Sequence, residues 1–153
     1  MSTLQARNEA TIQASNTVIW AIITDIALLP KVNPGVVKAS GSMNELNETR
    51  TCEVENRGRK GMITERLVEL VPGKKTVWRV ESDTMGMSKM LKDTRFFLLL
   101  EKVTDSITKV TAETHYTPAN IFARIMNGLM IRKMIAGVQQ KILFNIQGLT
   151  ENH

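Results

Sequence analysis

The sequence predicts an α+β fold in which a curved antiparallel sheet of about seven strands wraps around a long C-terminal helix, with two short helices after the first strand. Two observations carry this prediction. The segment from Asn120 to Gly148 contains no proline, and the preceding segment from Arg50 to Thr117 alternates like strands separated by short turns. Such a helix needs a broad apolar partner, which the strands supply. Because this arrangement usually encloses a pocket, we expect ligand binding.

The first part of the chain predicts one strand and two short helices. Arg7 to Ile12 alternates like a strand, and Ser15 has the side chain of an N-cap for a helix that ends near Thr24. Ala27 to Val32 adds a short helical turn. The sequence Asn33-Pro34-Gly35 then ends the helical region with a strong turn signal.

The middle of the chain predicts the rest of the sheet, with Pro72-Gly73 marking one tight turn. We expect these strands at Val36–Met43, Arg50–Asn56, Met62–Val71, Thr76–Ser82, Lys92–Val103 and Thr108–Thr117.

The C-terminal helix has two apolar stripes that do not align on an ideal helix. Ile131, Ile142 and Ile146 belong to one stripe, and Phe122 and Leu129 belong to the other. We expect a bend near position 128, or a short preceding helix, to reconcile them.

Composition limits the class of protein. A chain of 153 residues with 42% hydrophobic residues suits one domain, which we assign to 1–153. No stretch approaches the length of a membrane span and the N-terminus does not read as a secretory signal, so a cytoplasmic location is expected. A single cysteine and two histidines predict no disulfide, metal site or cofactor. The net charge of +5 is dispersed, which indicates a solvated basic surface and no nucleic-acid partner.

Alternation also predicts which side chains face the helix, because successive strand residues point to opposite faces. Glu53 and Glu55 mark the outer face of one strand, and Arg95 marks it in another. Phe97 and Leu99 also fall on the outer face, where they suggest a homodimer contact. The inward residues are our candidates for ligand contacts: Arg50, Cys52, Val54, Trp78, Val80, Thr94, Phe96 and Tyr116.

Glu65 is the sharpest prediction. Ile63, Glu65 and Leu67 stand at alternate positions of the strand, so their side chains face the same side of the sheet. Alternation thus places a carboxylate on an apolar face, where leaving it unpaired costs several kcal/mol. Ile63 and Glu65 therefore join the candidate ligand contacts. The alternative is a twisted or bulged strand that leaves Glu65 in solvent.

Several short motifs occur in an order that resembles the START-like (SRPBCC, helix-grip) superfamily, which includes polyketide cyclases, plant pollen allergens and abscisic-acid receptors. The resemblance covers almost the whole chain. Its motifs are Val18-Ile19-Trp20 followed by Asp25, Thr49-Arg50, Thr64-Glu65-Arg66-Leu67, and Tyr116 two residues before Pro118.

The resemblance implies roles for particular residues. In the hormone receptors the matching Thr-Glu-Arg-Leu segment turns its glutamate into the pocket, and a lysine in the strand that matches Val37-Lys38-Ala39-Ser40 binds the ligand's carboxylate. Lys38 is therefore expected to bind an anion and Glu65 to accept a hydrogen bond, unless Lys38 is a surface lysine. We expect the inward Arg50 to be a second anion partner. Met130, Met134 and Val138 are expected to roof the cavity, as the family's helix does. The receptors' gate and latch sequences are missing, so hormone perception is not implied.

Two other functions stay open. Some START-like proteins cyclise or dehydrate polyketides, and Glu65 and His115 are the candidate acid-base residues here. Alternation places His115 on the outer face, however, and the chain has no nucleophile elbow or phosphate-binding loop. Alternatively, Arg124, Arg132 and Lys133 lie beside apolar residues that could rest on a membrane during lipid exchange. We expect a small hydrophobic ligand as the main partner and membrane contact only as a lesser alternative.

Overall fold

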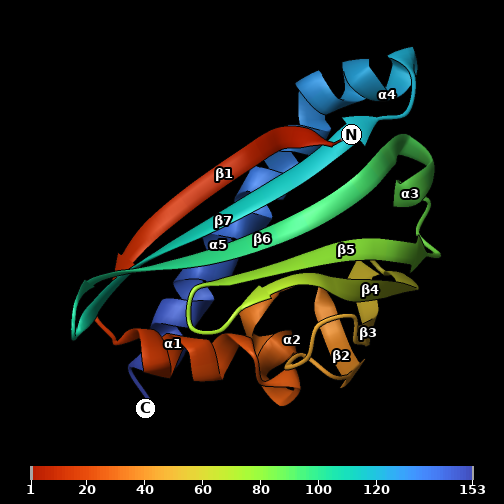
Figure 1. The fold of residues 1–153 in the computed structure, drawn as a ribbon. Coiled ribbons are helices and arrows are strands. Elements are labelled where there is room, and N and C mark those ends of the chain that lie inside the picture. The colour runs from red at the N-terminus through yellow and green to blue at the C-terminus, as the bar shows by residue number, and fades with distance from the viewer. Residues whose placement is uncertain (1, 153) are drawn as a thin grey trace.

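The computed structural model describes residues 2–152, which form one seven-stranded antiparallel sheet with helices on one of its faces (Figure 1). The strand order is β1-β7-β6-β5-β4-β3-β2. The strands are β1 (Thr3–Ile12), β2 (Val36–Gly41), β3 (Thr49–Asn56), β4 (Arg59–Val71), β5 (Lys75–Asp83), β6 (Leu91–Thr104) and β7 (Ile107–Pro118). The curved sheet and its long C-terminal helix confirm the predicted fold class.

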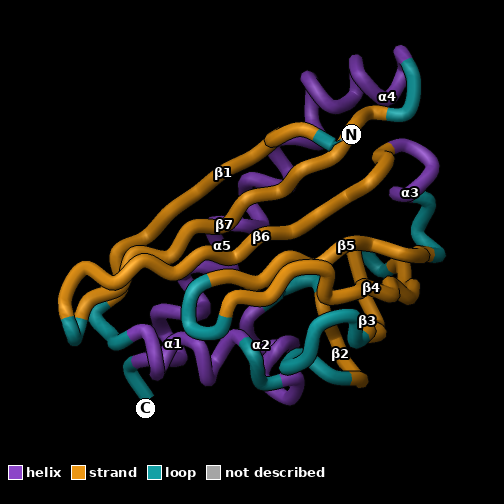
Figure 2. The backbone as a smooth tube through the Cα atoms, viewed as in Figure 1, coloured by secondary structure: helices purple, strands orange, loops and turns teal. Residues whose placement is uncertain are grey.

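The helical elements lie between the strands and at the C-terminal end of the chain (Figure 2). They are α1 (Asn16–Ile23), the 3-10 turn η1 (Ile26–Leu28), α2 (Leu29–Val32), α3 (Met87–Met90), α4 (Ile121–Met126), the π-helical turn η2 (Asn127–Ile131) and α5 (Arg132–Thr150). The short helix α3 was not predicted. It forms because the Asp83 carboxylate accepts hydrogen bonds from the backbone N–H groups of Met85, Met87 and Ser88.

The main core lies between α1, α5 and strands β6 and β7. Ser15 caps α1, with its hydroxyl 3.3 Å from the backbone nitrogen of Val18. Ile19 and Ile22 of α1 are buried against Ile142 and Ile146 of α5. The C-terminal half of α5 therefore packs directly on the sheet.

The π-helical turn η2 resolves the two misaligned stripes. An i→i+5 turn shifts the residues that follow it around the helix axis, so Ala123 of α4 and Ile131 and Ile142 further on are all buried. Asn127 is buried as well. Its Oδ1 atom accepts a hydrogen bond from the Tyr116 hydroxyl, and its Nδ2 atom donates to Gln5 at 3.0 Å. The expected bend near position 128 thus takes the form of a π turn.

Irregular pairing of β4 with β5 decides which residues of β4 face inward. The register between β4 and β5 shifts at Thr64/Glu65 and again at Leu67/Glu69. After the first shift, Glu65 lies between Arg50 of β3 and Val80 of β5. These three side chains share the face that is covered by the helices.

The outer face of the sheet carries Phe97 and Leu99, which are only half-buried. The ring of His115 lies 4.3 Å from that of Phe97, and the Lys75 ammonium lies 5.6 Å from the Phe97 ring. Neighbouring side chains thus cover part of the apolar surface, and the homodimer stays a prediction. Among the described residues, no helix has the length and hydropathy to span a bilayer.

Gly41 is a position where the fold demands glycine. Its φ of 114° is disfavoured for other residues, and a Cβ atom there would lie 2.4 Å from the carbonyl oxygen of Thr49 and 2.9 Å from the Cα of Arg50. The close approach of β2 and β3 at this point fixes the backbone of Arg50.

Replacing Gly41 by alanine is therefore expected to lower the free energy of unfolding by about 3 kcal/mol or more, because left-handed strain and a backbone clash add together. Gly73→Ala is the matched control: Gly73 has a φ of 76° and nothing within 4 Å of an added Cβ. We expect its cost to be about 1 kcal/mol. Urea denaturation measures both, and equal losses would contradict the proposed clash.

Candidate functional site

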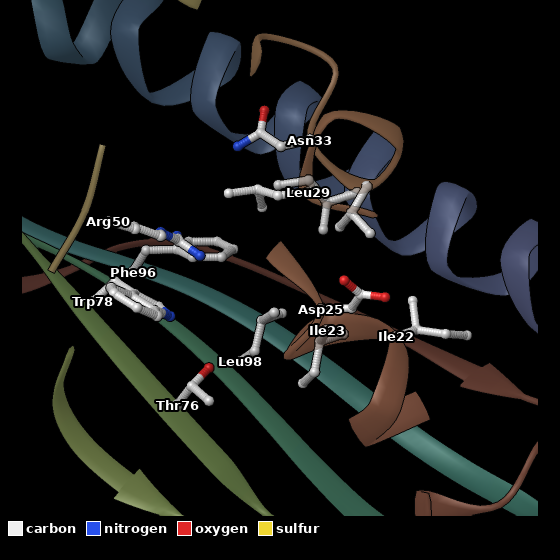
Figure 3. Close-up of a pocket in the computed structure, with 12 residues that line it drawn as sticks. Ile22, Ile23, Asp25, Leu29, Asn33, Arg50, Thr76, Trp78, Phe96 and Leu98 are labelled. Carbon is white, nitrogen blue, oxygen red and sulfur yellow. The ribbon is translucent and has the colours of Figure 1, made fainter. Parts of the chain in front are cut away.

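A small cavity lies between the sheet and the α1–α2 segment (Figure 3). Its volume is about 20 Å³, measured as the space that the centre of a water molecule can occupy. This is room for about one water molecule. Ile142 is the only described lining residue from α5. The lining comprises Ile22, Ile23, Asp25, Leu29, Val32, Asn33, Arg50, Thr76, Trp78, Phe96, Leu98 and Ile142.

The central polar feature is a buried ion pair on the sheet side. Arg50 Nε donates to Glu65 Oε1 at 2.8 Å, and the two side chains are 6% and 14% exposed. The guanidinium carbon lies 3.9 Å from the centroid of the Trp78 ring, so the cation stacks on an aromatic face. Met43 contributes a sulfur atom 3.9 Å from Arg50 Nη1. Figure 3 shows Arg50 beside Trp78 and Phe96.

The ion pair keeps unused hydrogen-bonding capacity. Within residues 2–152, Arg50 Nη2 and Glu65 Oε2 make no hydrogen bond. No fully buried side-chain nitrogen or oxygen in the described chain lacks a partner, so these two atoms retain access to space outside the protein. A hydrogen-bond donor and an acceptor are therefore open to a molecule that reaches the pair.

Cys52 lies beside the ion pair in the same apolar cluster as Trp78. Burial raises the pKa of its thiol from 9.0 to about 11, while Arg50 lowers it and Glu65 raises it further. The thiol is consequently protonated at neutral pH. In this state it behaves as a small apolar side chain and not as a nucleophile.

The opposite wall contributes polar groups from short helical elements. Asp25 Oδ1 accepts from the Ala27 N–H at 3.0 Å and caps η1, and Asn33 Oδ1 accepts from the Gly35 N–H at 3.0 Å. Asp25 joins no ion pair among residues 2–152. A carboxylate without a cationic partner thus lines the cavity, and Figure 3 shows it on the side opposite Trp78 and Thr76.

A family model described as polyketide cyclase/dehydrase and lipid transport matches residues 3–151. The chain belongs to this family.

Solved structures of several proteins share this fold. A START superfamily protein from Mycobacterium smegmatis superposes with a TM-score of 0.76 at 12% identity, covering 96% of this chain and 97% of its own. The Zhui aromatase/cyclase from Streptomyces sp. R1128 gives a TM-score of 0.72 at 14% identity, covering 99% and 94%. Norcoclaurine synthase from Thalictrum flavum, in complex with dopamine and hydroxybenzaldehyde, superposes with a TM-score of 0.72 at 14% identity. This match covers 100% of this chain and 88% of the synthase chain. No curated protein sequence matches the chain.

The structure of this family member brings together only part of the predicted ligand contacts. Arg50, Trp78 and Phe96 line the cavity. Glu65 does not line it but forms an ion pair with Arg50, which does. The remaining contacts from the strands lie on the same inner face but outside the lining: Cys52 is buried beside Trp78, and Val54, Ile63, Val80 and Thr94 are half-buried. The cavity is therefore displaced from the centre of the predicted site.

Lys38 does not face the interior as predicted. The β2–β3 register shifts between Val36 and Lys38, so Val37 is an extra residue in the strand. Because a bulge reverses the alternation that follows it, Ala39 faces inward, whereas Lys38 is exposed opposite Glu53. Lys38 is therefore removed from the anion site, which leaves Arg50.

The predicted roof under the C-terminal helix is also displaced. Met130 and Met134 are 51% and 42% exposed, and Val138 is half-buried against the main core. The C-terminal half of α5 packs into the main core through Ile142, Leu143 and Ile146, whereas Met130 and Met134 lie on the exposed side of the helical segment before it. Tyr116 is fully buried and its hydroxyl is bonded to Asn127, which withdraws it from ligand contact.

The acid-base candidate His115 lies on the outer face, on the opposite side of the sheet from the cavity. Its Nε2 atom is 2.9 Å from a carboxylate oxygen of Glu113. Among residues 2–152, no group of histidine, cysteine or acidic side chains has the arrangement of a metal site.

Sequence reasoning missed the second wall of the cavity. Thr76 could have been found, because it has the same parity as Trp78 in β5. In the sequence, Asp25 belongs to a motif of the family resemblance and Asn33 to a turn signal, and neither pattern places the residue at the cavity. Their position beside it depends on how the α1–α2 segment packs against the sheet.

Arg50→Met is expected to lower the free energy of unfolding by about 3 kcal/mol, because it leaves Glu65 in a largely buried site without its cation. The double variant Arg50→Met/Glu65→Leu should recover most of the loss. Arg79→Met is the control, because Arg79 is 39% exposed and its ion pair with Glu81 is long, at 3.7 Å. This substitution should lower the free energy of unfolding much less. Urea denaturation decides the matter: an Arg50 variant as stable as the control contradicts the importance of the pair.

The Cys52 thiol should make stability fall at high pH. Between the unfolded pKa of 9.0 and the folded pKa of about 11, the unfolded chain releases this proton while the folded chain keeps it. The stabilisation is therefore complete below pH 9 and is lost as the pH rises toward 11. Chemical denaturation across this range, compared with Cys52→Ala, should show a steeper loss for the native chain. Parallel pH curves would contradict the raised pKa.

Proposed function

We propose that this chain binds a small, largely apolar molecule that carries a hydroxyl or carboxylate group. The polar group of the ligand meets the Arg50–Glu65 pair, and its apolar part lies between the sheet and the α1–α2 segment. The observation that carries the proposal is the buried ion pair, whose cation Arg50 lines a mainly apolar cavity while Glu65 holds it in place. A few oriented polar groups in a mainly apolar lining are typical of small-molecule sites.

The lining favours a flat or aromatic ligand. Trp78 and Phe96 lie on the sheet side of the cavity, and Leu29 and Ile23 lie on the helix side (Figure 3). Aromatic side chains stack well on planar molecules. Burial of the apolar part of the ligand supplies the binding free energy, while Arg50 selects for an anionic or hydrogen-bonding group.

Binding requires the cavity to open, because ligand pockets commonly measure about 300 Å³ or more and this one measures about 20 Å³. We assign the opening to η1 and α2. These elements have three and four residues, which is too short for an intrinsically stable helix. A hydrogen bond from Asn145 of α5 to the Val32 carbonyl, 3.0 Å long, holds this segment in place. Opening would break this bond and withdraw Val32 from the main core, so movement of the segment is coupled to the packing of α5.

The structural relatives agree with this class of ligand. One of them is an aromatase/cyclase, and another is a synthase in complex with dopamine and hydroxybenzaldehyde, which are aromatic molecules with polar substituents. At 14% identity these proteins support the fold and suggest a ligand class for testing.

A cyclase or dehydratase is the second candidate function. The Asp25 carboxylate lines the cavity, caps η1 through one oxygen and joins no described ion pair. It is better placed for proton transfer than Glu65, which Arg50 holds, or His115, which lies on the outer face. Asp25→Asn keeps the cap and removes the base. It should abolish turnover, and leave ligand-dependent stabilisation intact, if the chain is an enzyme.

Thermal unfolding with 2-naphthoic acid, 2-naphthol and naphthalene as probes tests the binding proposal. We expect the acid to raise the melting temperature most, because it can pair with Arg50, and binding to quench the fluorescence of Trp78. Arg50→Met should remove the preference for the acid over naphthalene, while Lys38→Met, on the outer face, should leave it unchanged. Equal effects of the three probes, or loss of the preference in the Lys38 variant, would contradict the assigned anchor.

A further inference from the structure

We propose that α4, η2 and the first turn of α5 form a surface that binds anionic lipid bilayers. This inference goes beyond ligand binding in the cavity and does not depend on it. The α4 surface consists of Ile121, Phe122, Ile125, Leu129, Met130 and Met134.

The α4 surface is apolar and exposed. Ile121, Phe122 and Leu129 are 73%, 65% and 67% exposed. Ile121, Ile125 and Leu129 are spaced at four-residue intervals along the helical segment, so they fall on one side of it. Contiguous exposed apolar side chains of this size are uncommon on soluble domains and mark interaction sites. Elsewhere, exposed apolar residues such as Leu46, Val103 and Phe144 are far apart in the sequence.

The surface is held in a fixed orientation. Ala123, on the opposite side of α4, is fully buried, and Asn120 caps the helix by accepting a hydrogen bond from the Ala123 N–H at 2.8 Å. Met126 packs against the buried cluster of Leu91, Tyr116 and Ile131, as do Met87 and Met90 of α3. These contacts keep α4 from turning its apolar side inward. Figure 1 shows α4 at one end of the molecule, away from α1 and α2.

The charge around the surface favours an anionic partner. The sequence between Glu113 and Glu151 contains no acidic residue but includes Arg124, Arg132 and Lys133 near the apolar side chains. Arg124 and Lys133 join no ion pair among residues 2–152, and Arg132 donates only to Gln5. Unpaired cations beside large apolar side chains are the pattern of helices that lie in the headgroup region of anionic membranes.

A bilayer fits this combination better than a second copy of the chain. In a symmetric dimer the α4 surfaces would face each other, bringing like charges from Arg124 and Lys133 close together, and like charges across a contact are unfavourable. Anionic headgroups neutralise the same cations while the acyl boundary receives Phe122 and Leu129. At an anionic membrane, the charges and the apolar groups both favour binding, whereas in a dimer the charges oppose it.

Co-sedimentation with lipid vesicles tests the proposal. We expect the native chain to bind vesicles of phosphatidylglycerol and phosphatidylcholine, to bind vesicles of phosphatidylcholine alone much more weakly, and to be released by added salt. Phe122→Ser/Leu129→Ser should weaken binding by about tenfold or more, because two apolar anchors are lost. Phe144→Ser is the matched control, since Phe144 is 75% exposed on α5 outside the α4 surface, and it should bind like the native chain.

The cationic part is tested separately by Arg124→Gln/Lys133→Gln, which should reduce both the binding to anionic vesicles and its salt dependence. Arg50→Met should bind vesicles like the native chain, so failure of the cavity proposal and failure of this one are distinguishable. Circular dichroism checks that each variant is folded.

Phe122→Trp keeps the proposal falsifiable if the serine variants fail to fold. Its fluorescence should shift to the blue and be quenched by brominated lipids when anionic vesicles are added, whereas Phe144→Trp should not respond. Absence of vesicle binding by the native chain would overturn the proposal. So would equal losses in the Phe144 and Phe122/Leu129 variants, or a dimer, detected by sedimentation, that the Phe122/Leu129 substitutions dissociate without any binding to vesicles.

Discussion

The structure around the cavity depends on one interaction, the buried pair of Arg50 and Glu65. Two ions removed from water stabilise a fold only when they meet in good geometry, and here they meet on adjacent strands with an aromatic ring beneath the cation. That geometry demands the observed β3–β4 register and the close approach at Gly41. It also places two charged side chains in an otherwise apolar wall. The interaction that organises this part of the sheet is therefore the same one that we propose recognises a ligand.

Much of the architecture follows from periodicity in the sequence. Strand alternation and a long helical segment predict the sheet, the C-terminal helix and the inward side chain of Glu65. The failures arise where tertiary packing or a local irregularity overrides the pattern. The bulge at Val37 turns Lys38 outward, and nothing in a run of β-compatible residues signals that bulge. The second wall of the cavity comes from segments more than fifteen residues away from Arg50 in sequence, such as Asp25, so alternation within a strand cannot find it.

The two proposed activities occupy different regions of the molecule. The cavity lies under α1 and α2 and meets α5 at Ile142, whereas the α4 surface extends from α4 through η2 to the first turn of α5. The helix α5 spans the distance between them and is anchored to β1 by hydrogen bonds from Asn8 and Gln139. A lipid-exchange function would need both regions in one molecule, with the cavity as the carrier and the α4 surface as the contact with the membrane. A receptor or an enzyme would need only the cavity.

The π turn at Asn127–Ile131 gives the C-terminal region an unusual dependence on residue number. Because this turn accommodates one residue more than an α-helical turn, winding the same residues as a regular α-helix would rotate everything upstream by about 100° around the axis. Ala123 would then leave its buried place. Loss of one residue from the turn would instead restore a regular helix and keep the segments on either side facing as they do now. The direction in which α4 presents its apolar side therefore depends on the π turn that absorbs the extra residue between Met126 and Arg132.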